Sequence, residues 1–253
     1  MTAEIRDDSH AGKMLLDSLA VIFVRTRFPE NIGMAARACA NMGCPAMLLV
    51  RPERWDPLKA EPMATGQGMK IIRSIRIFPD LPAALAPFTT AYAATARLGG
   101  WRRRVKSPQA AAEEIAARLR QGERIALVFG SEDRGLENRE LASCQEIVSI
   151  PVEADARSLN LAQAALILLY ECRKACAGKA GAGGGERDFL TCAEKGLLEE
   201  SLKAALVKLN CFTETNQDYF FQQWRELLHR AGLRRHDYAA LMGLCRQIMN
   251  RVK

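Results

Sequence analysis

Short segments that are apolar at every position, each followed by a polar turn, constrain the fold of this chain most strongly. Leu19–Val24, Ala46–Val50 and Ile125–Phe129 all have this character, and residues 146–150 form a fourth, mixed run. A strand with only one buried face alternates polar and apolar residues, whereas a wholly apolar strand is typical of a parallel sheet covered on both faces. We therefore predict an α/β fold built on a parallel sheet.

Helix signals between these strands complete the pattern. Asn31 is predicted to cap a helix over residues 32–42 that ends at Gly43. Ser107 and Pro108 are predicted to start a helix that runs to about residue 120. A long apolar helix is predicted over residues 158–177. The remaining predictions are helices over 57–66 and 81–86 and strands over 75–78 and 89–95.

The composition changes after residue 177. Residues 178–186 are rich in glycine and predict a flexible linker. Helical periodicity follows, with helices predicted near residues 189–210, 216–231 and 235–251. The predicted organisation is a tail over residues 1–18, an α/β domain over 19–177, the linker over 178–186 and a helical domain over 187–253.

Charge and composition narrow the function classes. The net charge of +7 favours a polyanionic partner. Eight cysteines without a C-x-x-C pair, alongside three histidines, argue against a zinc site and predict buried thiols in a reducing cytosol. No apolar run approaches the ~20 residues of a membrane span, so we expect a cytoplasmic protein without metal or membrane contact. Neither a G-x-G-x-x-G fingerprint nor a P-loop is present, which disfavours a dinucleotide oxidoreductase.

Two clusters of polar and glycine residues follow predicted strands, and each has two interpretations. Arg37, among small neighbours on the first helix, is either a surface arginine or a guanidinium for phosphate. In the turn after residue 129, Glu132 is either an exposed acid or part of a loop in which Gly130 and Gly135 let main-chain amides approach a ligand.

Two further segments also have two interpretations each. Ser158 is either an N-cap or a ligand-facing hydroxyl, and Asn160 in the first turn of an apolar helix needs polar partners if it is buried. The basic residues 102–104, beside Trp101 and two glycines, form either a solvated loop or a mobile arm that grips phosphate and stacks a base.

Taken in order along the chain, these clusters resemble the three motifs of the knotted RNA ribose methyltransferases, the SPOUT superfamily. The matching stretches are Asn31-x-Gly33…Ala36-Arg37-Ala38…Gly43, Phe129-Gly130-x-Glu132-x-x-Gly135-Leu136 and Ile150-Pro151…Ser158-Leu159-Asn160-Leu161. The resemblance covers about residues 19–177. The helical tail is more loosely similar to that of bacterial tRNA 2′-O-methyltransferases that modify anticodon-loop nucleotide 32.

The resemblance implies a deep trefoil knot, S-adenosylmethionine (S-adenosyl-L-methionine) as cofactor, S-adenosyl-L-homocysteine as product, and an obligate homodimer. The residues it assigns to cofactor binding are Ala94, Thr95, Ala96, Gly130, Ile150, Arg157, Ser158 and Leu159. Those it assigns to catalysis are Arg37, Ser158 and Asn160. The RNA contacts expected are Asn31, Arg37, Arg97, Arg102, Arg103 and Arg104.

The activity implied is 2′-O-methylation of tRNA ribose. In the family Arg37 is proposed as the base, but arginine stays protonated in proteins, so we expect Arg37 to orient the substrate and stabilise charge while a phosphate takes the proton. Arg37 is expected to act in the partner subunit's site. The alternatives are an rRNA 2′-O-methyltransferase and a non-catalytic knotted RNA-binding protein; the helical tail, in place of an N-terminal RNA-binding domain, favours tRNA.

Overall fold

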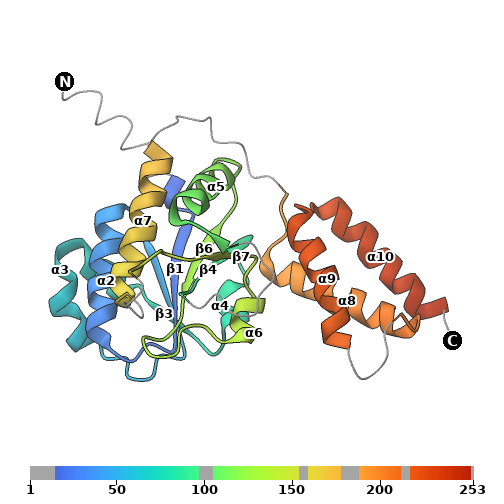
Figure 1. Ribbon diagram of the computed structural model, residues 1–253, viewed down its shortest axis with the longest axis horizontal. Coiled ribbons are helices and arrows are strands. Elements are labelled where there is room, and N and C mark those ends of the chain that lie inside the picture. The colour runs from blue at the N-terminus through green and yellow to red at the C-terminus, as the bar shows by residue number, and fades with distance from the viewer. Residues whose placement is uncertain (1–14, 97–104, 154–158, 178–187, 212–216, 252–253) are drawn as a thin grey trace. The chain divides into compact units, whose positions relative to one another are not determined.

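A computed structural model describes residues 15–96, 105–153, 159–177, 188–211 and 217–251 (Figure 1). The chain divides into two compact units, Met1–Arg187 and Asp188–Lys253. None of the helices within the described ranges is both long and apolar enough to cross a membrane.

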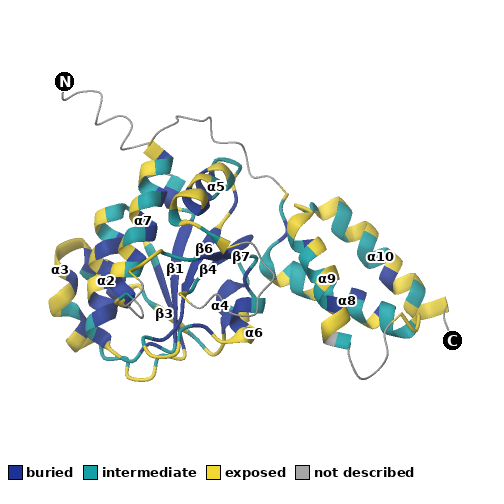
Figure 2. Cartoon of the chain, viewed as in Figure 1, coloured by how far each residue is buried: buried dark blue, intermediate teal, exposed yellow. Residues whose placement is uncertain are grey.

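The first unit is built on a seven-stranded sheet in the order β3-β2-β1-β6-β4-β7-β5. All its strand pairs are parallel, and β1 lies in register with both neighbours through Ala20↔Ala46 and Leu19↔Ile125. Its strands are β1 (Leu19–Val24), β2 (Ala46–Val50), β3 (Arg76–Phe78), β4 (Thr90–Ala94), β5 (Val105–Lys106), β6 (Ile125–Phe129) and β7 (Glu146–Val148). The predicted parallel α/β fold is confirmed, and β1 and β6 are buried along their whole length (Figure 2).

The four long helices share one face of this sheet. They are α2 (Pro29–Met42), α3 (Pro57–Arg73), α5 (Pro108–Arg120) and α7 (Leu161–Ala177). Their apolar residues join a single core with Val21 and Phe23 of β1 and Leu127 of β6, alternate residues that point to one face of a strand. The short helix α4 (Leu81–Leu85) packs against β2 and β3, and α6 (Asn138–Ala142) precedes β7.

The predicted start of the first helix is wrong. Helix α2 begins at Pro29, whose fixed φ suits the first helical position, and Phe28 is the N-cap. Asn31 therefore lies in the first turn, and its side chain is used in a tertiary contact instead of a cap. The predicted end is confirmed: Gly43 adopts φ 83° and its N–H donates to the Cys39 carbonyl.

Other boundaries also differ from the sequence predictions. Helix α3 continues past the predicted end at residue 66 to Arg73, across non-helical residues Thr65 and Gly66. Helix α7 begins at Leu161, not at residue 158, because the Asn160 carboxamide oxygen caps it by accepting from the Ala162 N–H at 2.9 Å. The short elements β5 and α6 were not predicted, since two to five residues carry too little periodicity.

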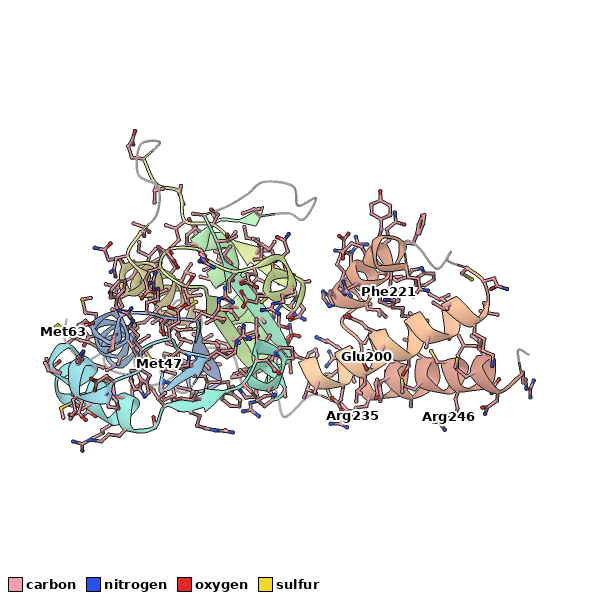
Figure 3. All side chains as sticks on the ribbon, turned by 90° about the horizontal axis from the view of Figure 1, so that it is seen from below. Met47, Met63, Glu200, Phe221, Arg235 and Arg246 are labelled. Carbon is pink, nitrogen blue, oxygen red and sulfur yellow. The ribbon has the colours of Figure 1, made fainter. Side chains whose placement is uncertain are left out.

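The second unit contains the helices α8 (Cys192–Lys208), α9 (Gln217–Arg230) and α10 (Arg235–Arg251). Thr191 caps α8 in a reciprocal capping box with Glu194. Phe221 on α9, labelled in Figure 3, is 1% exposed and belongs to a core of its own with residues of α8 and α10. The predicted helical C-terminal part is therefore confirmed.

Candidate active site

A cavity of about 510 Å³ opens at the carboxyl ends of β4, β6 and β7. Ligands of parallel α/β sheets bind at this edge. The volume falls in the range of cavities that hold small molecules, roughly 300–1,000 Å³. Its lining residues are Ala94, Thr95, Ala96, Phe129, Gly130, Ser131, Glu132, Asp133, Gly135, Val148, Ile150, Val152, Leu159, Leu161 and Ala164.

Many residues assigned to cofactor binding from the sequence meet in this cavity. They come from the segments after three different strands and from the turn before α7: Ala94, Thr95, Ala96, Gly130, Ile150 and Leu159. Arg157 and Ser158, also assigned to the site, lie outside the described residues, as do Arg97, Arg102, Arg103 and Arg104.

Gly130 must be glycine because the turn after β6 folds back onto it. A Cβ at this position would lie 2.0 Å from the carbonyl carbon of Gly135. The Gly135 N–H donates to the Ser131 carbonyl at 2.8 Å, and Gly135 itself has φ 67°, a value that favours glycine. The tight turn therefore accounts for both glycines, and it brings the main chain of residues 130–135 to the cavity wall.

A relay of hydrogen bonds joins the three sequence motifs beside this wall. The Asn160 carboxamide nitrogen donates to the Asn31 carboxamide oxygen at 2.9 Å. The Asn31 nitrogen in turn donates to Glu132 Oε1 at 2.9 Å, and Asn31 is 7% exposed. The Arg27 N–H donates to the second oxygen, Oε2, at 3.1 Å. We call Asn31, Glu132 and Asn160 the relay.

The relay shows how two residues with open interpretations, Glu132 and Asn160, are held in the structure. Glu132 is half-buried with a partner on each oxygen, so the interpretation as an exposed acid is wrong. Asn160 is exposed, yet it uses both ends of its carboxamide, one in the relay and one as the cap of α7. The relay thereby ties the starts of α2 and α7 to the turn after β6.

A partly buried ion cluster, which the sequence did not reveal, supports the same turn. Arg25 follows β1 with φ 53°; its guanidinium pairs with Glu140, lies 3.6 Å from a Glu137 oxygen and donates to the Gly135 carbonyl at 3.1 Å. Burial lowers the pKa of Arg25. In the sequence, this cluster was indicated only by an arginine after a strand and by acidic residues near the start of a helix. That these residues pair with one another follows from the order of strands in the sheet, which the sequence does not show.

The charges at the cavity favour a ligand with a cationic group. Its described lining contains the carboxylates Glu132 and Asp133 and no basic side chain. A hydrogen bond from the Ser131 hydroxyl at 3.0 Å lowers the pKa of Asp133, so this carboxylate stays ionised. Arg27 balances part of the charge from outside, at 3.1 Å from both Asp133 and Glu53.

Arg37 is placed differently from the rest of the predicted site. It is exposed on α2, does not line the cavity, and has no hydrogen-bond or ion-pair partner among the residues that the structure describes. Gly68 of α3 packs close to its backbone, where an added Cβ would lie 3.2 Å from the Arg37 nitrogen. The helix pair therefore fixes the backbone of Arg37 and leaves its guanidinium free for an external group.

The thiols do not form a second site. None of the eight cysteines, all of which lie within the described ranges, forms a disulfide, and six of them are buried. Burial raises the pKa of the Cys172 thiol, which disfavours the reactive thiolate. Over the described ranges, no three His, Cys, Asp or Glu side chains gather into a metal-binding group.

A small-molecule cavity at the carboxyl edge of a parallel sheet, bordered by a relay of amides and a carboxylate, defines a ligand-binding α/β domain. Sequence comparison specifies its kind. The chain belongs to the SpoU rRNA Methylase family, whose model matches residues 18–170. The resemblance to knotted RNA ribose methyltransferases is thereby confirmed.

Several relatives are described as tRNA methyltransferases. TrmJ of Pseudomonas aeruginosa, a tRNA (cytidine/uridine/adenosine-2′-O-)-methyltransferase, is 37% identical over 161 residues, 64% of this chain and 62% of that protein. TrmJ of Pectobacterium atrosepticum is 32% identical and is matched over 69% of this chain and 71% of its own. The chain thus matches less than two thirds of the length of the Pseudomonas relative.

The fold comparison agrees over a longer stretch. The crystal structure of TrmJ from Z. mobilis ZM4 matches with a TM-score of 0.77 at 30% identity, over 91% of this chain and 98% of that one. A methylase family protein from Neisseria gonorrhoeae matches with a TM-score of 0.65, 28% identity and 74% coverage of this chain, 95% of its own.

Proposed function

We propose that this protein transfers a methyl group from S-adenosylmethionine to the 2′-hydroxyl of a tRNA ribose in the cytoplasm, at anticodon-loop nucleotide 32. The observation that carries the proposal is the relay of Asn31, Glu132 and Asn160 beside a small-molecule cavity. The activities of the TrmJ relatives support the choice of tRNA ribose as substrate.

The cavity fits S-adenosylmethionine in chemistry as well as in size. Apolar side chains such as Phe129, Ile150 and Leu161 would pack against the adenine. The carboxylates Glu132 and Asp133 would attract the positively charged part of the molecule. The residues that would hold it are Ala94, Thr95, Ala96, Gly130, Ile150 and Leu159, joined by Arg157 and Ser158.

S-adenosylmethionine would supply an electrophilic methyl group on its sulfonium sulfur, with the neutral thioether S-adenosyl-L-homocysteine as the leaving group. The protein must then hold the 2′-hydroxyl in line and balance the charge that develops on its oxygen. Asn160, fixed by the hydrogen bonds of its carboxamide, and Ser158 would position the ribose. Arg37 stays protonated and would orient the neighbouring phosphate, which accepts the hydroxyl proton.

A homodimer would bring Arg37 to a site that its own chain does not offer. Helices α2 and α7 pack together (Figure 1), and exposed apolar side chains, Met34 on α2 and Leu166 and Tyr170 on α7, accompany Arg37 there. Burying these side chains against a second copy is favourable and would place Arg37 at the partner's cavity.

The strand order supports the knot. Strand β7 lies between β4 and β5 although it follows both in the chain, so the later segment enters a sheet between strands formed earlier. We propose that the chain is knotted here, and that Arg97, Arg102, Arg103 and Arg104, which lie outside the described residues, bind RNA phosphates.

Calorimetric titration with S-adenosylmethionine tests the cofactor site and separates an enzyme from a non-catalytic RNA-binding protein. We expect wild-type protein to bind, and Gly130→Ala to lose at least about tenfold in affinity because its Cβ overlaps Gly135. The matched control is Gly196→Ala in α8, where nothing lies within 4 Å of an added Cβ. Equal affinity of the two variants would remove the turn from the cofactor site.

Mapping of 2′-O-methylation in RNA from cells with and without the protein tests the substrate. We expect one anticodon-loop nucleotide of tRNA to lose its methyl group. The family description names rRNA, so rRNA is mapped in the same samples, and a loss confined to rRNA would replace tRNA as the substrate.

A further inference from the structure

Phe28 is an exposed aromatic residue three positions before Asn31 of the relay. It is the residue just before α2, its side chain is 51% exposed, and its backbone is extended with φ −112° and ψ 107°. None of the interactions of the relay or of the cavity wall uses its ring. The question is whether the surrounding structure prepares this ring for a ligand.

The backbone on both sides of Phe28 is fixed to the site. The Arg27 N–H donates to Glu132 of the relay at 3.1 Å, and the Phe28 carbonyl accepts from the N–H of Asn31, another relay residue, at 3.0 Å. Arg27 is also paired with Asp133 and Glu53, and Pro29 follows with a fixed φ. A ring held on such a short, anchored segment loses little conformational entropy when a partner stacks on it.

We propose that Phe28 forms the stacking platform for the base of the nucleotide whose ribose is methylated. This inference rests on the proposed function. A nucleotide splayed out of the RNA loop would present its ribose to the relay and its base to Phe28, and unstacked bases are commonly received by aromatic side chains. Phe28 lies four residues after the end of β1 at Val24 and three residues before Asn31, so the proposed platform adjoins the relay in the chain.

The proposal makes a statement about specificity. Phenylalanine has no hydrogen-bonding group, so its ring contacts the face of a base and reads none of its edges. Phe28 therefore strengthens binding of any base that stacks, and it does not by itself select cytidine over uridine. Any discrimination between cytidine and uridine would come from polar groups around Phe28.

The test is a double-variant cycle with full-length protein and tRNA transcripts. Phe28→Ala, Phe28→Leu and Phe28→Tyr are assayed on a transcript with a normal target nucleotide and on one with an abasic ribose there. We expect Phe28→Ala and Phe28→Leu to lower kcat/KM roughly 5- to 100-fold on the normal transcript, and Phe28→Tyr to retain the wild-type value, because base stacking is worth about 1–3 kcal/mol. On the abasic transcript, all four proteins should be equally slow.

A merely structural role for Phe28 would lower kcat/KM on both transcripts by the same factor, and that result overturns the proposal. Dissociation of a Phe28→Ala dimer to monomers in sedimentation would overturn it too, since the ring would then pack on a second copy. Ile77→Ala is the matched control: Ile77 is 54% exposed on the edge strand β3 and should leave every rate unchanged. If wild-type protein methylates no tRNA, the proposed function fails; if it does and the Phe28 variants match it, only the platform fails.

Discussion

At the amino end of the sheet, Glu123 is 3% exposed and accepts hydrogen bonds from the hydroxyls of Thr89 and Thr90, each at 2.9 Å. Its other oxygen lies 3.2 Å from a nitrogen of Arg118, which also contacts Glu114. None of these side chains lines the 510 Å³ cavity. Each carboxylate in this group has a hydrogen-bond or ion-pair partner, so the group holds the starts of β4 and β6 together.

At the carboxyl end, the relay is also hydrogen-bonded, but it lies against the cavity. Glu132 belongs to both the relay and the cavity wall. Burial and hydrogen bonding of a carboxylate therefore do not distinguish a functional site from a structural network. What distinguishes them is an adjoining cavity and, on the same helix as Asn31, the exposed charge of Arg37, which has no partner among the residues that the structure describes.

The largest effect is expected for the unmatched charge. Arg37→Ala should lower kcat about 100- to 1,000-fold, the size of effect found when a group that stabilises transition-state charge is removed. Affinity for S-adenosylmethionine, measured by calorimetry, should be unchanged because the proposed contact of Arg37 is with the substrate phosphate and not with the cofactor. Arg73→Ala, at the exposed end of α3, is the matched control. Wild-type turnover by Arg37→Ala would remove this residue from the mechanism.

The relay carboxylate should come next. Glu132→Gln cannot accept on both sides as Glu132 does from Asn31 and Arg27, so the relay loses one hydrogen bond. We expect kcat to fall roughly 10- to 100-fold, since misplacement of reacting groups by about 1 Å is this costly. The unfolding free energy from urea titration should fall by only about 1 kcal/mol. An unaltered kcat would show that the relay holds the fold together and has no part in catalysis.

The amino-end carboxylate should behave in the opposite way. Glu123→Gln keeps the shape but weakens the bonds to Thr89, Thr90 and Arg118. We expect the unfolding free energy to drop by about 1–3 kcal/mol, while kcat per folded molecule stays at the wild-type value. If kcat falls as it does for Glu132→Gln, the distinction between the two ends of the sheet is lost.

The smallest effect concerns pH. Burial raises the pKa of Glu114, but its contacts with Lys106 and Arg118 outweigh burial, and the net shift is downward. A carboxyl group with a depressed folded-state pKa stabilises the protein above its unfolded pKa, about 4.3, and loses that contribution as pH falls through the folded value. The stability gap between wild type and Glu114→Gln should therefore narrow below about pH 4 in urea titrations. A gap that stays constant would show that the ion pairs contribute no net stability.

Local sequence signals predicted the elements but not the contacts between them. The apolar runs gave β1, β2 and β6, and Gly43 gave the end of α2, because burial pattern and backbone conformation are properties of neighbouring residues. The relay joins Asn31 to residues 101 and 129 positions away, and the partner of each amide depends on strand order and register. The assignment of Asn31 as a helix cap went wrong for this reason: a tertiary partner used the side chain.

The most direct test is mass-spectrometric mapping of purified tRNA after incubation with the protein and methyl-labelled S-adenosylmethionine. The account predicts label on the ribose 2′-oxygen of a single anticodon-loop nucleotide, and none with Arg37→Ala. Label on a base, or no label on any tRNA from a protein that binds the cofactor, would contradict it.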